Sequence, residues 1–342
     1  MTSAPFIALE DPDVSAALDE GMAQVEAALR EAVHHVDRYI DGASNHLVQA
    51  GGKRLRPLLT LLAAQLGSVG GAPGSGPASS SRSADVVKAA VVVELTHLAS
   101  LYHDDVMDEA LLRRGVPSAN ARYGNTVAIL TGDLLFARAS QLVADLGTDA
   151  VRTQAQTFER LCAGQIAETV GPSPGQDPVA HYLSVLADKT GSLIATAGLF
   201  GARFGGCDGA TVEMMRQYGE RLGVAFQLAD DLIDLSSATE ESGKTPGTDL
   251  REGVPTLPVL LARRSSDPAD AELLELLAGS LDDDARLVRA VALLRAHPAL
   301  EQARAQTVAW ADDARAALAP LPDSPVKAAL EMLATAVVER SA

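Results

Sequence analysis

Residues 98–115 read LASLYHDDVMDEALLRRG and close an apolar stretch with three carboxylates, Asp104, Asp105 and Asp108. Residues 226–235, FQLADDLIDL, repeat the pattern with Asp230, Asp231 and Asp234. Positions i and i+4 of a helix lie on one face, so the first and last carboxylates of each cluster repel each other by roughly a few tenths of a kcal/mol. Because the sequence contains this unfavourable arrangement twice, we expect the carboxylates to have a function.

The surroundings of both clusters favour a metal-binding role. Each cluster follows apolar residues, HLASLY in the first case and GVAFQLA in the second. Carboxylates at the ends of apolar helices are costly unless they are paired or bound to a metal. Oxygen ligands without His or Cys suit Mg²⁺, which bridges carboxylates to phosphate oxygens. The alternative, solvated acidic helix ends, explains one cluster better than two matching copies.

The composition predicts a helical protein with an acidic surface. The chain has 342 residues, of which 47% are hydrophobic and 4% aromatic. This favours a large core of packed helices over aromatic-rich strands. A formal net charge of -17 argues against nucleic acid as a partner, because nucleic-acid binders need basic patches. A phosphorylated substrate can still bind such a chain through metal cations.

Several features predict a cytoplasmic protein. Cys162 and Cys207 have no metal-ligand spacing and fit a reducing compartment. The first residues are acidic and lack a signal-peptide pattern, and no uncharged apolar run reaches transmembrane length.

Apolar residues recur at helical spacing along most of the chain. The predicted helices cover residues 14–36, 85–110, 126–146, 150–170, 178–202 and 210–235, followed by helical sequence from Pro258 to Ala342. Residues 67–84 contain 13 Gly, Ser or Pro out of 18 and predict a flexible loop between two helices.

Cations are available to neutralise a polyphosphate. They are Lys53, Arg54 and Arg56 in GGKRLRP, Arg113 and Arg114 after the first cluster, Lys189 in DKTGSL and Lys244 in GKTPGTDL. His97 precedes Asp104 by seven residues, or two helical turns, and is expected to face the same cavity. Each of these residues, taken alone, also fits an ordinary surface or core position.

Together these segments resemble the trans-isoprenyl diphosphate synthase, or polyprenyl synthetase, family. The resemblance extends from Asp37 to Arg340 and rests on the order and spacing of GGKRLRP, HDDVMD, RRG, GDLLFARA, KTGSL, FQLADDLID and GKTPGTDLREGVPTLP. It implies a single polyprenyl synthetase domain over 1–342, folded as an all-α isoprenoid synthase-type helical bundle around a deep central cavity. It also implies a homodimer that uses Mg²⁺ to condense an allylic diphosphate with isopentenyl diphosphate.

The resemblance implies a role for each candidate residue. The magnesium ligands on the allylic diphosphate are Asp104, Asp105, Asp108, Asp230, Asp231 and Asp234. The cations on the same diphosphate are Arg113, Lys189 and Lys244. The pocket for isopentenyl diphosphate consists of Lys53, Arg56, His97 and Arg114. The polar lining near the forming carbocation consists of Thr190 and Gln227. The released diphosphate is the implied base, in keeping with the lack of an obvious His or Glu general base in the motifs.

The residues one turn before the first cluster bear on product length. Ala99 and Ser100 are small, where medium-chain members of the family often carry an aromatic floor. The segment looks most like the long-chain synthases that make quinone side chains, which predicts a product of C30 or longer, with a menaquinone-type tail as its use. Ser100 falls near the face of Asp104, whereas Ala99 does not. Phe158 and Tyr102 are candidates for a deeper floor.

The sequence leaves several alternative functions open. Within the family, the chain could be a farnesyl or geranylgeranyl diphosphate synthase. Outside it, the alternatives are a class I terpene cyclase, a non-catalytic subunit of a heteromeric synthase, or a purely structural bundle. The second aspartate cluster and the intact GGKRLRP argue against the cyclase. The presence of all six aspartates argues against the non-catalytic subunit, and a structural bundle leaves the doubled motif unexplained. We expect at most a transient membrane contact, during release of the apolar product, and no amphipathic anchor indicates it.

Overall fold

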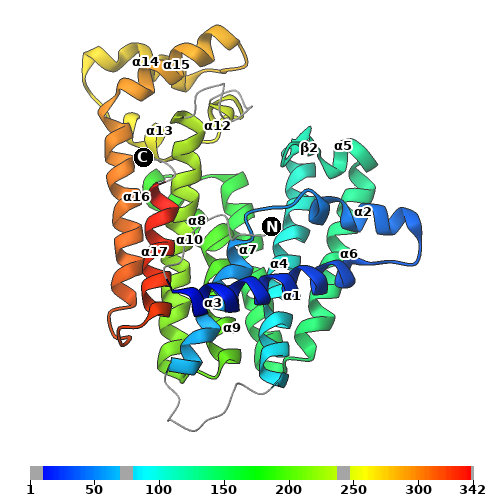
Figure 1. Ribbon diagram of the computed structural model, residues 1–342. Helices are drawn as coiled ribbons and strands as arrows, with labels where there is room; N and C mark the ends of the chain where they lie inside the picture. Colours follow the sequence, from blue (N-terminus) through cyan, green and yellow to red (C-terminus); the bar gives the residue numbers. More distant parts are fainter. Residues whose placement is uncertain (1–10, 70–79, 237–246, 340–342) are drawn as a thin grey trace. The chain divides into compact units, whose positions relative to one another are not determined.

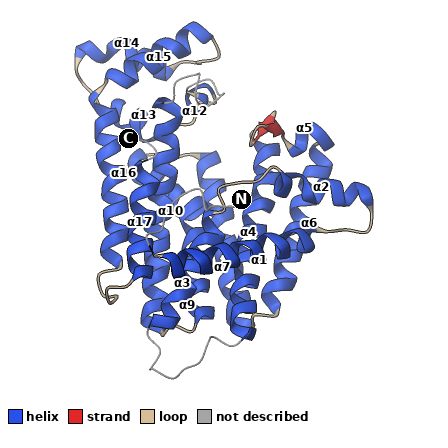
Figure 2. Ribbon diagram, in the orientation of Figure 1, coloured by secondary structure: helices blue, strands red, loops and turns tan. Residues whose placement is uncertain are grey.

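The computed structural model describes residues 11–69, 80–236 and 247–339. Helices dominate this part of the chain, and a single short hairpin supplies its strands (Figure 2). The chain divides into two compact units. Unit 1 comprises Met1–Glu159, Leu193–Gly219 and Ala317–Leu333, and unit 2 comprises Arg160–Ser192, Glu220–Ala316 and Ala334–Ala342. The all-α prediction is confirmed, whereas the single-domain assignment stays a prediction.

The elements follow one another along the chain from α1 to α17 (Figure 1). The first helices are α1 (Pro12–Val33), α2 (Arg38–Gln49), α3 (Leu55–Val69) and α4 (Ser80–Met107). A hairpin of β1 (Leu112–Arg113) and β2 (Val116–Pro117) pairs antiparallel, with Arg113 opposite Val116. The next helices are α5 (Ala119–Tyr123), α6 (Asn125–Ala144), α7 (Thr148–Val170) and α8 (Pro178–Leu186).

A π-helical turn, Ala187–Gly191, separates α8 from α9 (Ser192–Gly205). The remaining elements are α10 (Gly209–Ser236), α12 (Thr248–Arg251), α13 (Leu257–Ala262), a 3₁₀ turn (Pro268–Asp270), α14 (Ala271–Ala278), α15 (Asp284–Ala296), α16 (Pro298–Ala317) and α17 (Pro325–Glu339). The core of unit 2 is rich in leucine, including Leu228 and Leu232 of α10, Leu260 of α13 and Leu294 of α15.

Acidic caps mark where several helices begin. Asp11 accepts hydrogen bonds of 3.0 Å from the backbone N–H groups of Asp13 and Val14 at the start of α1. Asp177 caps α8 in the same way, and a proline follows each of these two caps. Such caps satisfy N–H groups that lack a partner within the helix, and proline fits the first helical position. The residue pattern around these helices therefore encodes their starts.

Helix α4 is the central element of unit 1. Its residues Val91–Leu95 are almost fully buried, because α4 packs against α1, α3 and α6. A helical stretch that is buried on all sides lies in the interior of its domain, and this one includes the charged Glu94. The first aspartate cluster therefore lies at the end of a buried helix, which is where an unpaired carboxylate is most costly.

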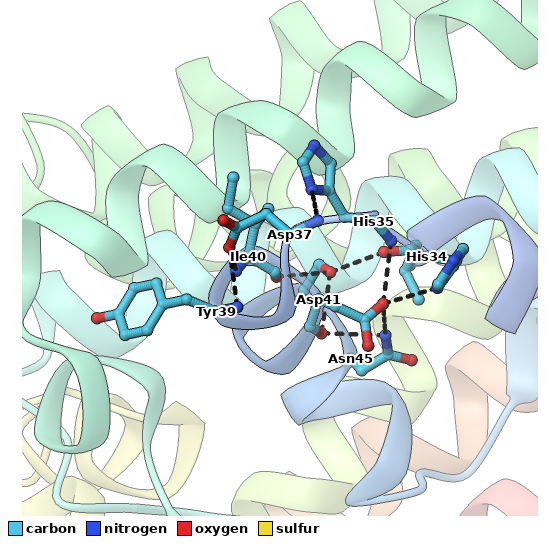
Figure 3. Close-up of polar contacts among 9 residues, drawn as sticks. His34, His35, Asp37, Tyr39, Ile40, Asp41 and Asn45 are labelled. Atoms are coloured by element: carbon cyan, nitrogen blue, oxygen red, sulfur yellow. Dashed lines mark hydrogen bonds and ion pairs between the residues drawn. The ribbon is translucent and has the colours of Figure 1, made fainter.

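The corner between α1 and α2 is held by a polar network (Figure 3). The Asp41 carboxylate lies 2.9 Å from Nδ1 of His34 and accepts hydrogen bonds from the backbone N–H of His35 and the amide of Asn45. The His35 backbone bond, together with the two nearby imidazoles, lowers the pKa of Asp41, although partial desolvation opposes this shift. The network fixes the chain where it enters α2.

The structure differs from the predicted elements in three places. Helix α3 extends to Val69 and α4 begins at Ser80, so both ends of the predicted 67–84 loop are helical. Residues 70–79 of that loop lie outside the described residues. The predicted helix over 178–202 is interrupted by the π-helical turn, and a short hairpin stands where no strand is predicted.

Candidate active site

The first aspartate cluster lies at the carboxyl end of α4. Asp104 and Asp105 belong to its last turn, and Asp108 follows directly after the helix. The Asp108 N–H donates a 2.8 Å bond to the Asp104 carbonyl, so helical register continues through the cluster. Asp104 and Asp108 retain exposed surface. This is the arrangement predicted from their i,i+4 spacing.

Asp105 has a different environment from its neighbours. Its residue surface is 0% exposed. One carboxylate oxygen accepts a 2.6 Å bond from Nε of Arg113, and the other accepts a 3.2 Å bond from the backbone N–H of Ala119. Asp105 therefore fastens the hairpin and the start of α5 to α4. The structure gives it a positioning role, and a ligand role for Asp105 stays a prediction.

The hairpin carries the two arginines predicted to bind diphosphate. Nη2 of Arg113 lies 3.9 Å from the Asp108 carboxylate, in addition to its bond with Asp105. His46 of α2 contacts both the hairpin and α5. Its Nε2 lies 2.7 Å from the Pro117 carbonyl oxygen, and its Nδ1 lies 3.2 Å from Nη1 of Arg122. Since the arginine can only donate, Nδ1 accepts and Nε2 donates to the carbonyl.

Arg56, His97 and Arg114 are half-buried and form a basic cluster. Burial, together with the charge of Arg114, lowers the pKa of Arg56 to about 10, although the charge of Glu94 opposes this shift. Nε of Arg56 is buried without a hydrogen-bond partner among the described residues. Burial, followed by the charges of Arg56 and Arg114, holds the pKa of His97 well below its usual value. A neutral imidazole beside two arginines is suited to bind an anion.

In unit 2, the π-helical turn presents Lys189 and Thr190. Lys189 lies 2.5 Å from the Glu168 carboxylate, and the Thr190 hydroxyl donates a 3.2 Å bond to Gln227. A Cβ atom at Gly164 would lie 2.7 Å from the Lys189 backbone nitrogen, so only glycine fits where α7 meets the turn. π-Helical turns occur frequently at functional sites.

Arg160 of α7 forms ion pairs with the π-helical turn and with α10. Its Nε donates a 2.7 Å bond to Asp188, and its Nη2 donates a 2.8 Å bond to Glu220. Arg160 thereby links the π-helical turn to α7 and α10, beside the two residues that the turn presents.

The second aspartate cluster lies near the carboxyl end of α10. The buried Asp231 accepts a hydrogen bond from the Tyr182 hydroxyl and a 3.0 Å bond from the Gln227 amide. Burial raises the pKa of Asp231 to about 6; the Tyr182 and Gln227 bonds lower it, and the charges of Asp230 and Asp234 raise it further. Asp231 is therefore built into its unit, as Asp105 is.

Asp234 and Asp230 keep part of their surface exposed. Asp234 accepts 3.2 Å bonds from the backbone N–H groups of Thr248 and Asp249, which begin α12. The middle carboxylate of each cluster is thus buried, and the outer carboxylates are not.

The donor set fits magnesium bound together with a substrate. No group of three His, Cys, Asp or Glu side chains in the described ranges forms a ready-made metal cage. Mg²⁺ commonly uses only one or two carboxylates and completes its shell with water and substrate phosphate oxygens. The outer carboxylates Asp104, Asp108, Asp230 and Asp234 are oxygen donors of this kind.

The residues predicted to set product length lie on α4 and α7. Ala99 is fully buried, and the buried Ser100 donates to the His97 carbonyl at 2.8 Å. The Tyr102 hydroxyl donates a 2.5 Å bond to the Ala43 carbonyl of α2, which accounts for its direction. The Phe158 ring lies 4.3 Å from that of Phe136, so this candidate floor has an aromatic partner.

Sequence reasoning missed Tyr182, Arg160 and the π-helical turn. No local motif marks them, since their partners lie far away in the sequence. Lys53 is exposed in the turn before α3, and Lys244 lies outside the described residues.

Comparison with known proteins supports the resemblance. The profile of the family described as Polyprenyl synthetase matches residues 37–294. The chain belongs to this family. A nonaprenyl diphosphate synthase of Mycobacterium tuberculosis is 48% identical over 332 residues, which cover 97% of this chain and 96% of that protein. The family and the prenyl diphosphate synthase class predicted from the motifs are confirmed.

Two solved structures share the fold of this chain. A geranylgeranyl pyrophosphate synthase from Corynebacterium glutamicum, complexed with calcium and isoprenyl diphosphate, has a TM-score of 0.84 and 45% identity, covering 98% of this chain and 99% of that chain. A polyprenyl synthase from Caulobacter crescentus, with the same ligands, has a TM-score of 0.86 and 35% identity, covering 99% of this chain and 100% of that chain.

Proposed function

We propose that this polyprenyl synthetase is a long-chain trans-prenyltransferase that condenses an allylic diphosphate with successive isopentenyl diphosphates. The observation that carries the proposal is the pair of binding elements on α4. His97 belongs to a half-buried basic cluster, and Asp104 belongs to a carboxylate cluster about 10 Å further along the same helix. A basic cluster suited to bind one anion directly, on the same helix as carboxylates suited to bind another through metal ions, fits a reaction of two diphosphates.

The side chains divide the work between the two substrates. Arg56, Arg114 and neutral His97 hold isopentenyl diphosphate, with Lys53 at the rim. Arg113 and Lys189 donate to the allylic diphosphate, and Lys244 is proposed to join them. The outer aspartates would hold Mg²⁺, which would supply positive charge to the diphosphate that departs as the carbon–oxygen bond breaks.

The remaining groups protect and direct the reaction. Thr190 and Gln227, linked by their hydrogen bond, present oxygen atoms near the electron-deficient carbon. Apolar walls exclude water, which would otherwise capture the cation. The alkene of isopentenyl diphosphate attacks that carbon, and the released diphosphate accepts the proton that is then lost.

A product of C30 or longer follows from the small residues Ala99 and Ser100 and from the similarity to a nonaprenyl diphosphate synthase. The similar geranylgeranyl pyrophosphate synthase keeps a shorter product as the alternative. A menaquinone-type side chain is the proposed use of the long product.

Product analysis tests the reaction and the length together. The purified chain is incubated with isopentenyl diphosphate, Mg²⁺ and, separately, C5, C10, C15 and C20 allylic diphosphates, and products are read by mass spectrometry. A ladder that ends at C30 or beyond supports the proposal. A product that stops at C15 or C20 contradicts the length but keeps the chemistry. No elongation with any primer favours a non-catalytic subunit.

We also propose a cytoplasmic homodimer. Helix α6 exposes Ile129 and Leu130, and it is long and apolar enough, by length and composition only, to cross a membrane. A core helix of a soluble protein passes the same test, and coverage by a second copy would bury these side chains. Membrane contact is proposed to be limited to the release of the apolar product.

A further inference from the structure

Arg54 has a different environment from the other cations of the turn before α3. Its side chain is only 7% exposed. Nε donates a 2.5 Å bond to Glu26 of α1, Nη1 donates a 2.8 Å bond to Glu94 of α4, and Nη2 lies 3.3 Å from the Val48 carbonyl of α2. One guanidinium at the start of α3 therefore joins three other helices.

Glu94 is the buried counter-charge of this region. Its side chain is 2% exposed and lies on α4, three residues before His97. Burial alone would lower the pKa of Arg54, but the charges of Glu94 and Glu26 raise it overall. The charge of Glu94 also opposes the lowering of the pKa of Arg56 and Arg114 in the basic cluster. Only Arg54 is seen to form a direct ion pair with Glu94 in the described part of the chain.

The turn that Arg54 ends also holds Arg114. The Arg114 guanidinium donates to the Gly51 and Leu47 carbonyls, and a Cβ atom at Gly52 would lie 2.7 Å from it. Arg54 itself has a φ of 50°, in the left-handed region that a non-glycine residue adopts only where its surroundings enforce it. The ion pairs of Arg54 thus hold the turn against which Arg114 rests.

We propose that Arg54 is a positioning residue for the diphosphate of isopentenyl diphosphate, acting through Glu94 and the Gly51–Gly52 turn. It leaves Arg56, Arg114 and His97 to contact the substrate. This inference rests on the proposed function and assigns Arg54 no contact with either substrate. Its rivals are a direct cation for the diphosphate and an ion pair that contributes only stability.

The variants Arg54→Met, Glu94→Leu and the double variant Arg54→Met/Glu94→Leu separate these roles. Removing a buried negative charge beside a direct anion site strengthens anion binding, whereas removing a support weakens it. The double variant removes both charges of the buried Arg54–Glu94 pair, and Glu26 keeps Arg30, whose Nη2 lies 3.8 Å from its carboxylate. Apolar replacement of a buried ion pair is usually tolerated. Arg289→Met, which breaks the exposed pair with Glu272, is the matched control.

KM is measured for isopentenyl diphosphate and for the allylic substrate separately, with melting temperatures alongside. We expect all three variants to raise KM for isopentenyl diphosphate by about tenfold or more, with KM for the allylic substrate changed less than about twofold. The double variant is expected to regain melting temperature without regaining KM. Arg289→Met is expected to change neither KM.

Two results overturn the inference. A lower KM for isopentenyl diphosphate in Glu94→Leu indicates a simple electrostatic role. A wild-type KM in the folded double variant indicates a purely structural pair. If a single variant does not fold, KM for isopentenyl diphosphate is compared between the unmodified chain, the double variant and Glu26→Gln, which removes one charged partner of Arg54. These values still distinguish a positioning role from a purely structural one. Turnover by the unmodified chain tests the proposed function separately from all of these.

Discussion

Nε of Arg113 lies 2.6 Å from the carboxylate of Asp105, and this bond joins the hairpin to the end of α4. The pair gives the middle aspartate a task different from that of Asp104 and Asp108. Asp231 resembles Asp105 in this respect, because its two oxygens accept from Tyr182 and Gln227. In both clusters, one buried carboxylate organises the protein while the exposed carboxylates remain accessible to metal and substrate.

The division between Asp104 and Asp105 predicts different responses to magnesium. Asp104→Asn is expected to lower kcat by roughly 10² or more and to raise the Mg²⁺ concentration needed for half-maximal rate. Asp105→Asn is expected to lower the melting temperature, because it weakens the bond to Arg113, and to leave the Mg²⁺ requirement close to that of the unmodified chain. Magnesium titrations of turnover check this, and equal shifts in both variants would make Asp105 a ligand.

Arg160 is predicted to support catalysis from outside the reacting groups. Arg160→Met removes its bonds to Asp188 and Glu220, and the π-helical turn that carries Lys189 is expected to loosen. We expect kcat to fall by about tenfold while KM for isopentenyl diphosphate stays unchanged. Arg216→Met, which breaks an exposed i,i+3 pair, serves as the comparison in steady-state assays. Equal kcat values for the two variants would argue against the support.

The lowered pKa of His97 leads us to expect that the stability of the folded chain depends on pH. Burial, reinforced by the charges of Arg56, Arg114, Arg54 and Arg113, holds the pKa of His97 well below its usual value in the folded chain. In the unfolded chain the group titrates near 6.5, so below about pH 6.5 the unfolded state binds a proton that the folded state does not. Stability therefore falls as pH decreases below that value and is unaffected above it.

His97→Gln removes this titration. Between pH 7 and pH 5 the unmodified chain is expected to lose stability more steeply than the variant, by on the order of 1 kcal/mol per pH unit. Denaturant unfolding across that pH range provides the measurement. Parallel curves would show that His97 has the same pKa in the folded and unfolded chain.

Ser100 predicts control of product length. It is one turn before Asp104, and Ser100→Phe places a ring where the lengthening chain is expected to pass. The longest product is expected to shorten by at least one isoprene unit, with the rate of the first condensation largely retained. Mass spectrometry of the products checks this against Val288→Phe on the exposed face of α15. An unchanged ladder would place the floor elsewhere, with Phe158 and Phe136 as the next candidates.

The exposed apolar face of α6 predicts association. Leu130 is 60% exposed on this helix. Leu130→Asp is expected to shift the molecular mass measured by light scattering from dimer toward monomer, because a charge is costly in an apolar interface. A monomeric mass for the unmodified chain would remove the basis for the dimer.

The sequence predicted the helices and both aspartate clusters, because helical periodicity and i,i+4 spacing are local properties. It could not distinguish Arg54 from Arg56. These arginines lie two residues apart in one motif. Arg54 forms ion pairs with Glu26 and Glu94, whereas Nε of Arg56 has no hydrogen-bond partner among the described residues. The difference depends on a positive φ and on carboxylates from distant helices, which no local pattern records.

The π-helical turn escaped prediction for a related reason. The residues ADKTG fit an α-helix as well as a π-helix, and the wider turn is stabilised by Arg160 and by the close approach of Gly164. The same applies to the Asp105–Arg113 bond, which exists only because the hairpin folds back onto α4.

The wider turn at Ala187–Gly191 also alters the helical phase of everything that follows it. Each residue of an α-helix advances the side chains by about 100°, so one residue accommodated in a π-helical turn rotates α9 relative to an uninterrupted continuation of α8. Deleting a single residue from this turn would leave every amino acid of α9 in place in the sequence, yet would turn its buried face toward a different set of neighbours. For this segment, the number of residues is therefore as strict a requirement as their identity.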